Sequence, residues 1–206
     1  LAVLLNGNNF LDGLNGLISG YYLIIILSLI ILKSLYPDTV TIDYNFLKIL
    51  LYILIIFIIF NLFGLVYLGD SGSYALALLV GIYLINFYSL NYLISPYYIA
   101  IALWYPSFEN LFSLLRRLIV KKNVSNADNY HLHQLFFLFL KSKKILNKKI
   151  LNSVSAIIII LLNVPSIIIS NFYATKSTPL LIILSVNIFF YLLFYYILFQ
   201  NFIKQK

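Results

Sequence analysis

Long uninterrupted runs of apolar residues dominate the chain. A helix needs about 20 apolar residues to cross roughly 30 Å of hydrocarbon. Six runs approach that length, and Gly, Asn, Asp or Pro punctuate the segments that join them. The pattern therefore predicts an all-α fold, namely a polytopic transmembrane helix bundle with about six spans. The expected spans are Leu14–Leu32, Phe46–Tyr67, Tyr74–Leu90, Leu93–Leu111, Ile150–Ser170 and Leu180–Phe202.

Composition supports the bilayer as the solvent of this chain. Of its 206 residues, 63% are hydrophobic and only 10% are charged, and the mean hydropathy is +0.99. Soluble domains are about half apolar and about a quarter charged. No internal repeat or linker divides the chain, so we expect a single transmembrane domain over residues 1–206. The chain contains no cysteine, which excludes disulfides and thiolate metal sites.

The basic residues are distributed unevenly between the two sides of the predicted bundle. Residues 1–13, 68–73, 112–149 and the end of the chain fall on one side, which carries eleven of the fourteen Lys and Arg residues. The positive-inside rule places this side in the cytoplasm. The net charge of +8 does not indicate a nucleic-acid partner, because the basic residues are sparse and form no recurrent face. The chain does not begin with Met, so we expect the C-terminal part of a longer protein of the bacterial inner (plasma) membrane.

Three polar clusters interrupt the apolar pattern, and the expected topology places all three on the cytoplasmic side. Their common side predicts one composite site. The clusters are Asn6-Gly-Asn-Asn9-Phe-Leu-Asp12-Gly-Leu-Asn15, Tyr67-Leu-Gly69-Asp70-Ser71-Gly72-Ser73 and Asn126-Ala-Asp128-Asn-Tyr-His131-Leu-His133-Gln134.

The residue types in these clusters suit phosphate chemistry. Asp12 and Asp70 each precede an apolar helix at the expected membrane edge, where a carboxylate is costly unless it binds a cation or a partner. Carboxylate oxygens suit Mg²⁺, which combines a few of them with substrate phosphates. Ser73 lies where a helix is expected to begin, and the N-terminus of a helix attracts phosphate. His131 and His133 can donate to a diphosphate or shuttle protons.

Each cluster also has a simpler interpretation. Asp12 and Asp70 can act as N-caps of the helices that follow them. A His-x-His pair in a basic loop is often a solvated surface, and Tyr67 alone is typical of an aromatic residue at the membrane interface. No single motif decides between the two interpretations.

In their order along the chain, the clusters resemble the polyprenyl-phosphate N-acetylhexosamine-1-phosphate transferases of glycosyltransferase family 4. This family includes phospho-N-acetylmuramoyl-pentapeptide transferase and the WecA-type enzymes, and the chain is closer to the WecA-like branch. The resemblance covers about residues 6–140 and includes the segment Tyr105–Arg117 before the His cluster. Asn15 stands where the family often has a second Asp, and Gln134 where it often has a His. The family's acidic pair from an earlier loop has no counterpart in this chain.

The resemblance implies transfer of an N-acetylhexosamine-1-phosphate from a UDP-sugar to undecaprenyl (polyprenyl) phosphate with release of UMP. This reaction initiates the synthesis of cell-envelope polysaccharides. The resemblance makes Asp70 a ligand of Mg²⁺, or of Mn²⁺, and makes Asp12, His131 and His133 catalytic together with Asp70. Its implied substrate-binding residues are Asn6, Asn9, Asn15, Tyr67 and Ser73.

The implied partners are UDP-N-acetylhexosamine, polyprenyl phosphate and the lipid bilayer, with no nucleic acid and with a homodimer as the candidate assembly. The last span and its neighbours would form the lipid groove. Because the acidic pair is missing, we expect this chain to be inactive alone. A catalytically inactive membrane scaffold and a membrane transporter are the alternatives. A transporter would need polar residues near the middle of its spans, and few are present here.

Overall fold

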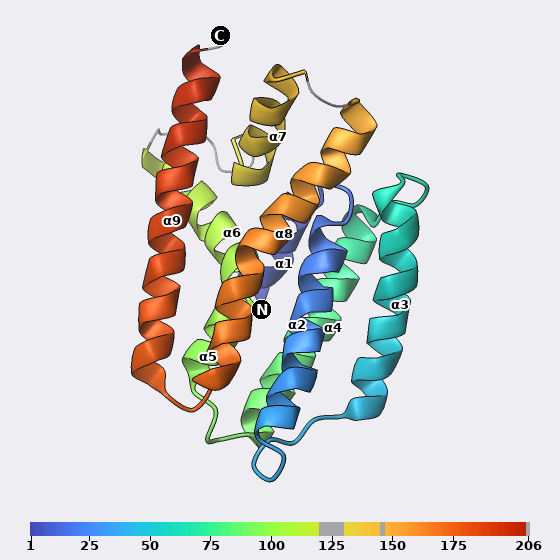
Figure 1. Ribbon diagram of the computed structural model, residues 1–206, viewed down its shortest axis with the longest axis vertical. Helices are drawn as coiled ribbons and strands as arrows, with labels where there is room; N and C mark the ends of the chain where they lie inside the picture. Colours follow the sequence, from blue (N-terminus) through green and yellow to red (C-terminus); the bar gives the residue numbers. More distant parts are fainter. Residues whose placement is uncertain (120–129, 145–146, 205–206) are drawn as a thin grey trace.

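The computed structural model describes residues 1–119, 130–144 and 147–204. These residues form helices and no strands, which confirms the all-α fold class (Figure 1). We call the end of the bundle that carries the C-terminus the upper end, and the opposite end the lower end. The helices are α1 (Ala2–Leu11), α2 (Leu17–Leu35), α3 (Tyr44–Leu62), α4 (Gly69–Leu90), α5 (Pro96–Ala102), α6 (Trp104–Ile119), α7 (Leu132–Ser142), α8 (Lys148–Phe172) and α9 (Ser177–Lys204).

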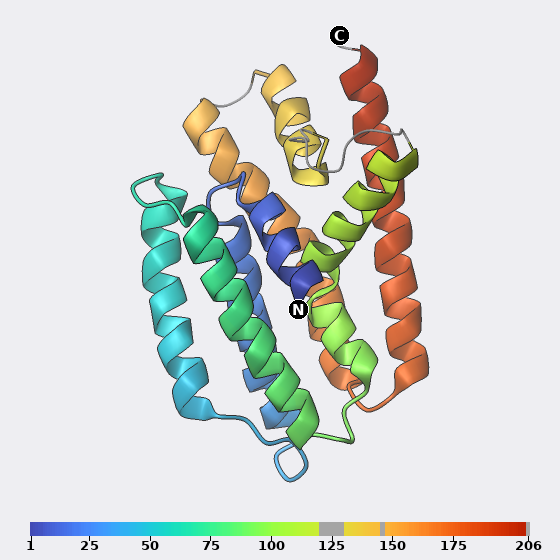
Figure 2. The same ribbon diagram turned by 180° about the vertical axis from the view of Figure 1, so that it is seen from behind.

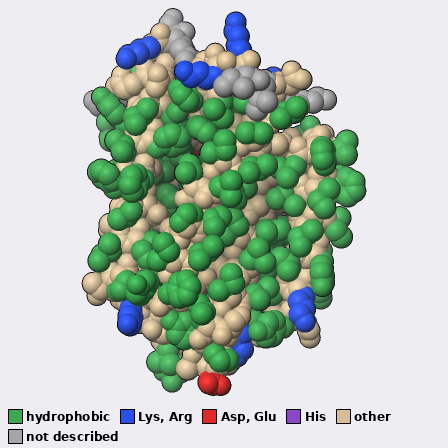
Figure 3. Space-filling model, viewed as in Figure 1, with side chains coloured by type: hydrophobic (Ala, Val, Ile, Leu, Met, Phe, Trp, Pro, Cys, Tyr) green, Lys and Arg blue, Asp and Glu red, His purple; other side chains and the backbone are tan. Residues whose placement is uncertain are grey.

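Among the described residues, α2, α3, α4, α8 and α9 are each long and apolar enough to cross a membrane. They correspond to five of the six expected spans. Many of their outward side chains are apolar and exposed, such as Ile53, Leu161 and Ile182. Figure 3 shows hydrophobic side chains covering the flank of the molecule, with Lys and Arg only toward the two ends. A contiguous apolar surface of this extent indicates contact with lipid rather than water.

The sixth expected span, Leu93–Leu111, is not one continuous helix. It is divided at Leu103 into α5 and α6. Pro106 has no N–H to donate to the preceding turn, so it favours a new helix in which it occupies the first turn. The two helices together still lead from the lower end toward the upper end (Figure 2). The segments that follow therefore keep their expected ends of the bundle.

The structure also differs from the expected loop at residues 1–13, most of which is the helix α1. This helix packs between α4 and α6. Asn8 and Leu11 are buried on its packed face. Gly7 allows a very close approach, because a Cβ at this position would lie only 2.1 Å from the carbonyl oxygen of Pro106. The apolar Leu4 and Leu11 and the small Gly7 on this face explain why the segment folds into the bundle, and the buried Asn8 is satisfied there by the carbonyl of Ser73.

The expected loop at residues 112–149 is likewise partly helical. It contains the end of α6, all of α7 and the first residues of α8. Residues 120–129 and 145–146, which include Asn126 and Asp128 of the third cluster, lie outside the described part of the chain.

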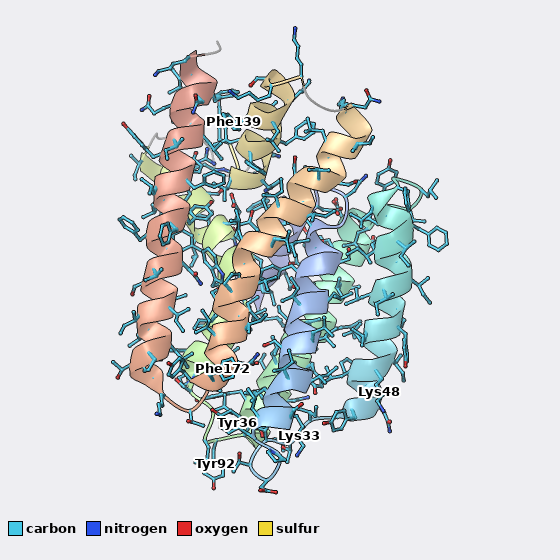
Figure 4. The ribbon with its side chains drawn as sticks, viewed as in Figure 1. Lys33, Tyr36, Lys48, Tyr92, Phe139 and Phe172 are labelled. Atoms are coloured by element: carbon cyan, nitrogen blue, oxygen red, sulfur yellow. The ribbon has the colours of Figure 1, made fainter. Side chains whose placement is uncertain are left out.

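The lower end is closed by hydrogen bonds between the connecting segments. The main-chain N–H of Thr41 donates to Asn91 Oδ1 at 2.7 Å, which joins the α2–α3 connection to the end of α4. The Tyr36 hydroxyl donates to the carbonyl of Phe172 at 3.2 Å, and both residues are labelled near the bottom of Figure 4. These bonds tie the connecting segments of the lower end to one another.

Candidate active site

The upper end brings together the turn after α1, the turn before α4 and the start of α7 (Figure 1). Asn61, in the last turn of α3, joins the first two turns. Its Oδ1 accepts from the main-chain N–H of Gly16, and its Nδ2 donates to the carbonyl of Val66 at 2.7 Å. Gly16 has a φ of 86°, a conformation that glycine adopts without strain. The turn after α1 is therefore fixed against the connection between α3 and α4.

Asn15 and Tyr67, two predicted substrate-binding residues, lie close to each other. The main-chain N–H of Asn15 donates to Asn152 Oδ1 at 2.7 Å. This bond does not involve the side-chain amide of Asn15. A Cβ placed on Gly64 would lie 3.4 Å from Asn15 Nδ2 and 3.5 Å from the Tyr67 hydroxyl. The Tyr67 side chain is 70% exposed. The amide of Asn15 and the hydroxyl of an accessible tyrosine thus flank the same glycine.

Asp12 and Asp70 lie at the same end, close enough for the charge of Asp70 to act on Asp12. Burial and the negative charge of Asp70 raise the pKa of Asp12 to about 6, although the main-chain N–H of Gly69 donates to its carboxylate and acts in the opposite direction. Asp70 itself is exposed in the first turn of α4. The helix α4 begins at Gly69, earlier than expected, so Asp70 is its second residue and Leu68 is its N-cap. Asp12 is the C-cap of α1, and the N-cap of α2 is Gly16. The interpretation of Asp12 and Asp70 as N-caps is therefore wrong. Two carboxylates that repel each other in this way would both be stabilised by a bound cation.

His133 is completely buried beside the turn that carries Asp12. A Cβ on Gly13 would lie 3.1 Å from His133 Nε2. Neither ring nitrogen of His133 has a hydrogen-bond partner in the described structure. Burial lowers the pKa of His133 to about 4, and the nearby Glu109 charge only partly opposes this shift. His133 is therefore neutral at pH 7 and can offer one N–H donor, but no charge, to a ligand.

His131 connects the His segment to α1. It is the N-cap of α7, and its ring stacks on that of His133 with centroids 5.6 Å apart and an interplanar angle of 16°. The His131 ring also contacts the ring of Phe10 in α1, with the two centroids 5.0 Å apart. The structure thus places the His segment beside the first polar cluster, as its predicted side of the bundle required.

Asn6, Asn9 and Ser73 do not converge on the two carboxylates in the same way. Asn6 is exposed and lines a cavity of about 370 Å³ between α1 and α4. It lies about 9 Å below Asp12 along the helix, at 1.5 Å per residue. Asn9 is partly buried. Ser73 is fully buried and its carbonyl accepts from Asn8 Nδ2 at 3.3 Å, while its Oγ has no partner.

Several polar residues of this end were missed by the sequence patterns. Glu109 is fully buried and lies 3.1 Å from His131 Nδ1. A signal for it was available, since it is the only Glu in the chain and interrupts an apolar segment. Asn61 and Asn152 carried no comparable signal, because their partners are main-chain groups of turns distant in sequence.

The carboxylates present fit a magnesium ion that is completed by substrate. No group of three or more His, Cys, Asp or Glu side chains with metal-site geometry occurs in the described ranges. Mg²⁺ usually takes only one or two carboxylates from the protein, and substrate phosphates and water complete its octahedral shell. Asp70, with Asp12 close to it, matches that donor set.

Comparison with known proteins agrees with these motifs. Residues 1–88, which contain both Asp12 and Asp70, match the family described as Glycosyl transferase family 4. A stretch of 133 residues is 31% identical to the undecaprenyl-phosphate alpha-N-acetylglucosaminyl 1-phosphate transferase of Thermotoga maritima. The match covers 65% of this chain and 39% of that protein, so the chain spans well under half of this relative's length. No solved structure matches the chain.

Proposed function

We propose that the full-length protein of this chain, whose residues 1–88 match glycosyl transferase family 4, transfers an N-acetylhexosamine-1-phosphate from a UDP-sugar to a polyprenyl phosphate. A phosphate oxygen of the lipid attacks the β-phosphorus of the UDP-sugar. The bond from that phosphorus to the bridging oxygen breaks, and UMP leaves with the bridging oxygen. The product is the lipid diphosphate sugar, the first intermediate of a cell-envelope polysaccharide.

The observation that carries this proposal is the meeting of Asp12 and Asp70. The two residues belong to separate motifs and to different helix ends, yet the charge of Asp70 adds to the effect of burial in raising the pKa of Asp12 to about 6. Neither residue is the N-cap of the helix that follows it, because those N-caps are Gly16 and Leu68, so helix capping does not explain why the two charges lie together. A site for a divalent cation and a diphosphate explains the arrangement.

The roles of the residues follow from their places. Asp70 and Asp12 would hold Mg²⁺, which when bound would neutralise charge on the diphosphate. Neutral His133, buried beside Gly13, would donate one hydrogen bond toward a phosphate oxygen. Tyr67 would stack on the uracil ring and Asn15 would bond to its edge. The partners proposed here are UDP-N-acetylhexosamine, polyprenyl phosphate and the bilayer.

The lipid tail of the acceptor requires an apolar surface that is continuous with this end. A cavity of about 420 Å³ lies among α6, α8 and α9, and its lining is mostly apolar. One of its lining residues, Tyr191, also donates to Glu109, which lies against His131. We propose that an isoprenoid segment occupies this cavity while its phosphate lies near the carboxylates.

The basic residues support a cytoplasmic position for the upper end. Arg116, Arg117 and the Lys residues near the end of α7 lie toward this end, whereas Lys33 and Lys48 lie at the lower end (Figure 4). Excess positive charge next to membrane spans marks the cytoplasmic side. A nucleotide sugar made in the cytoplasm would then reach the site directly in the bacterial plasma membrane.

Replacement of Asp70 by Asn in the full-length protein tests the proposal. Asp70 lies in the first turn of α4 behind the N-cap Leu68, and Asn differs from Asp in charge but hardly in size, so a purely structural Asp70 predicts an unchanged rate. A metal ligand predicts a loss of about 10²–10³-fold, because a neutral amide binds a hard dication poorly. UMP release from UDP-N-acetylhexosamine and polyprenyl phosphate, with Mg²⁺ titrated, measures the difference. Asp38→Asn, at an exposed position of the lower end, is the matched control and should retain full activity.

A further inference from the structure

Glu109 is a fully buried carboxylate in the middle of α6. A buried charge is strongly destabilising unless hydrogen bonds and opposite charge compensate it. Three donors surround this one. Glu109 Oε1 accepts from the main-chain N–H of Leu132 at 3.0 Å and lies 3.1 Å from His131 Nδ1, while Oε2 accepts from the Tyr191 hydroxyl at 2.8 Å.

These donors belong to two other helices. Leu132 is the first residue of α7, and Tyr191 lies in the middle of α9. The N-cap residue of α7, His131, makes no side-chain capping bond of its own. Glu109 supplies that bond from α6, and a negative charge next to a helix N-terminus is favourable. A single carboxylate thus docks the start of α7 onto α6 and α9.

The same carboxylate determines which nitrogen of His131 carries the proton. An ionised carboxylate only accepts hydrogen bonds, so the short contact with Nδ1 requires a proton on Nδ1. Nε2 is then the nitrogen through which His131 can meet a ligand. Ser113 Oγ also lies 3.1 Å from Nδ1 and adds a weaker, neutral contact to the same atom.

We propose that Glu109 is a positioning residue for the transfer reaction, which docks the His131–His133 segment against α1 and fixes the Nδ1-protonated form of His131. This inference rests on the proposed function for the role of His131 and His133 in the transfer reaction. The contacts of Glu109 do not depend on that function. Through the stacked rings, the orientation of His131 also determines that of His133, whose Nε2 lies next to Gly13. Glu109 itself acts only through these histidines.

The test replaces Glu109 by Gln in the full-length protein. Gln retains the size of the side chain but loses the charge that holds the Nδ1 proton. We expect kcat for UMP release to fall roughly 10–100-fold, as for other residues that orient a catalytic group from behind, with a smaller change in KM for the UDP-sugar. The ¹⁵N spectrum of labelled histidine should show loss of the single Nδ1-protonated form of His131, identified by comparison with His131→Asn.

Two further variants distinguish positioning from simple packing. Ser113→Ala removes only the neutral contact to Nδ1, so it should keep the His131 tautomer and most of the activity. In a His131→Asn background, Glu109→Gln should cause little additional loss of kcat, because coupled residues are not additive. Fully additive losses would mean that Glu109 does not act through His131. If Glu109→Gln does not yield folded protein, the same measurements are made on Glu109→Asp. Asp keeps the negative charge, but its side chain is shorter by one methylene, which moves the carboxylate away from His131.

The results also separate this inference from the proposed function. If the wild-type protein releases no UMP, the proposed function fails, while the histidine spectra still test the role of Glu109. If the wild type is active and Glu109→Gln keeps both its kcat and the His131 tautomer, the positioning role is wrong and the proposed function stands.

Discussion

Asn91 at the lower end and His133 at the upper end are both buried polar side chains, but their surroundings are opposite. Asn91 uses its whole amide group: Oδ1 accepts from Thr41, and Nδ2 donates to the carbonyls of Thr41 and Phe87 at 3.0 Å and 2.7 Å. His133 is equally buried and has no partner for either nitrogen. The two side chains carry the same burial penalty, and only one of them is compensated within the protein.

The difference separates a buried polar group that is satisfied within the described structure from one that is not. Native proteins satisfy nearly all buried polar groups, so an unsatisfied group requires a specific explanation. The same contrast holds for acidic residues. Asp43 is an ordinary N-cap that accepts from the main-chain N–H groups of Asn45 and Phe46 at 3.0 Å each. Asp12 lies instead within the field of a second carboxylate. Asp12 and His133, both at the upper end, therefore have charge and hydrogen-bonding requirements that the described structure leaves unmet and that a charged ligand would satisfy.

The largest effect should come from exchanging each of these acids for its amide in the full-length protein. Asp12→Asn should lower UMP release about 10²–10³-fold, because it removes a charge near the proposed cation and diphosphate. Asp43→Asn should leave the rate within twofold, roughly, because Asn is an equivalent cap. Both variants should insert into membranes at wild-type levels. Equal rates of UMP release for Asp12→Asn and Asp43→Asn would contradict the different roles assigned to these two carboxylates.

How much of this arrangement is predictable from the sequence differs between the fold and the site. The five long spans were predictable because an apolar run of sufficient length has few other stable structures than a membrane helix. The division at Leu103 was missed, although Pro106 was a visible signal. The burial of α1 was also missed, because it depends on the contact between Gly7 and Pro106, which are far apart in sequence.

For the site, the sequence predicted the common end of the three clusters but not their internal geometry. The proximity of Asp12 and Asp70 follows from the topology, since both residues lie at helix ends on one side of the bundle. The contacts of Glu109 depend on the register of α6 against α7 and α9. Hydrophobic patterning defines a helix face only as an apolar stripe about 100° wide, so it does not determine such pairings.

A second pair of variants compares stability with activity at the two ends. Asn91→Ala removes several buried hydrogen bonds and leaves main-chain groups unpaired, so it should lower the unfolding free energy by about 2–4 kcal/mol. Activity per folded molecule should not change. His133→Leu replaces an unsatisfied polar group by an apolar one, which is usually neutral or stabilising. It should nevertheless reduce kcat roughly 10–100-fold, the value of one hydrogen bond to a charged group.

Thermal unfolding in detergent, followed by UMP-release assays on the same samples, measures both quantities. A destabilised His133→Leu protein with normal kcat would reverse the assignment and make His133 a structural residue.

The smallest expected effect concerns two exposed tyrosines, one at each end. Tyr67 and Tyr92 are 70% and 85% exposed, so their replacement by Ala should hardly affect stability. If Tyr67 stacks on the uracil ring, Tyr67→Ala should raise the KM for the UDP-sugar about tenfold, since stacking of a base on an aromatic side chain contributes about 1–3 kcal/mol. Tyr67→Phe should retain most of the affinity, because the ring face remains, and Tyr92→Ala should match the wild type. An unchanged KM for Tyr67→Ala would return this residue to the role of an interfacial aromatic and would move the base-binding surface toward Asn15 alone.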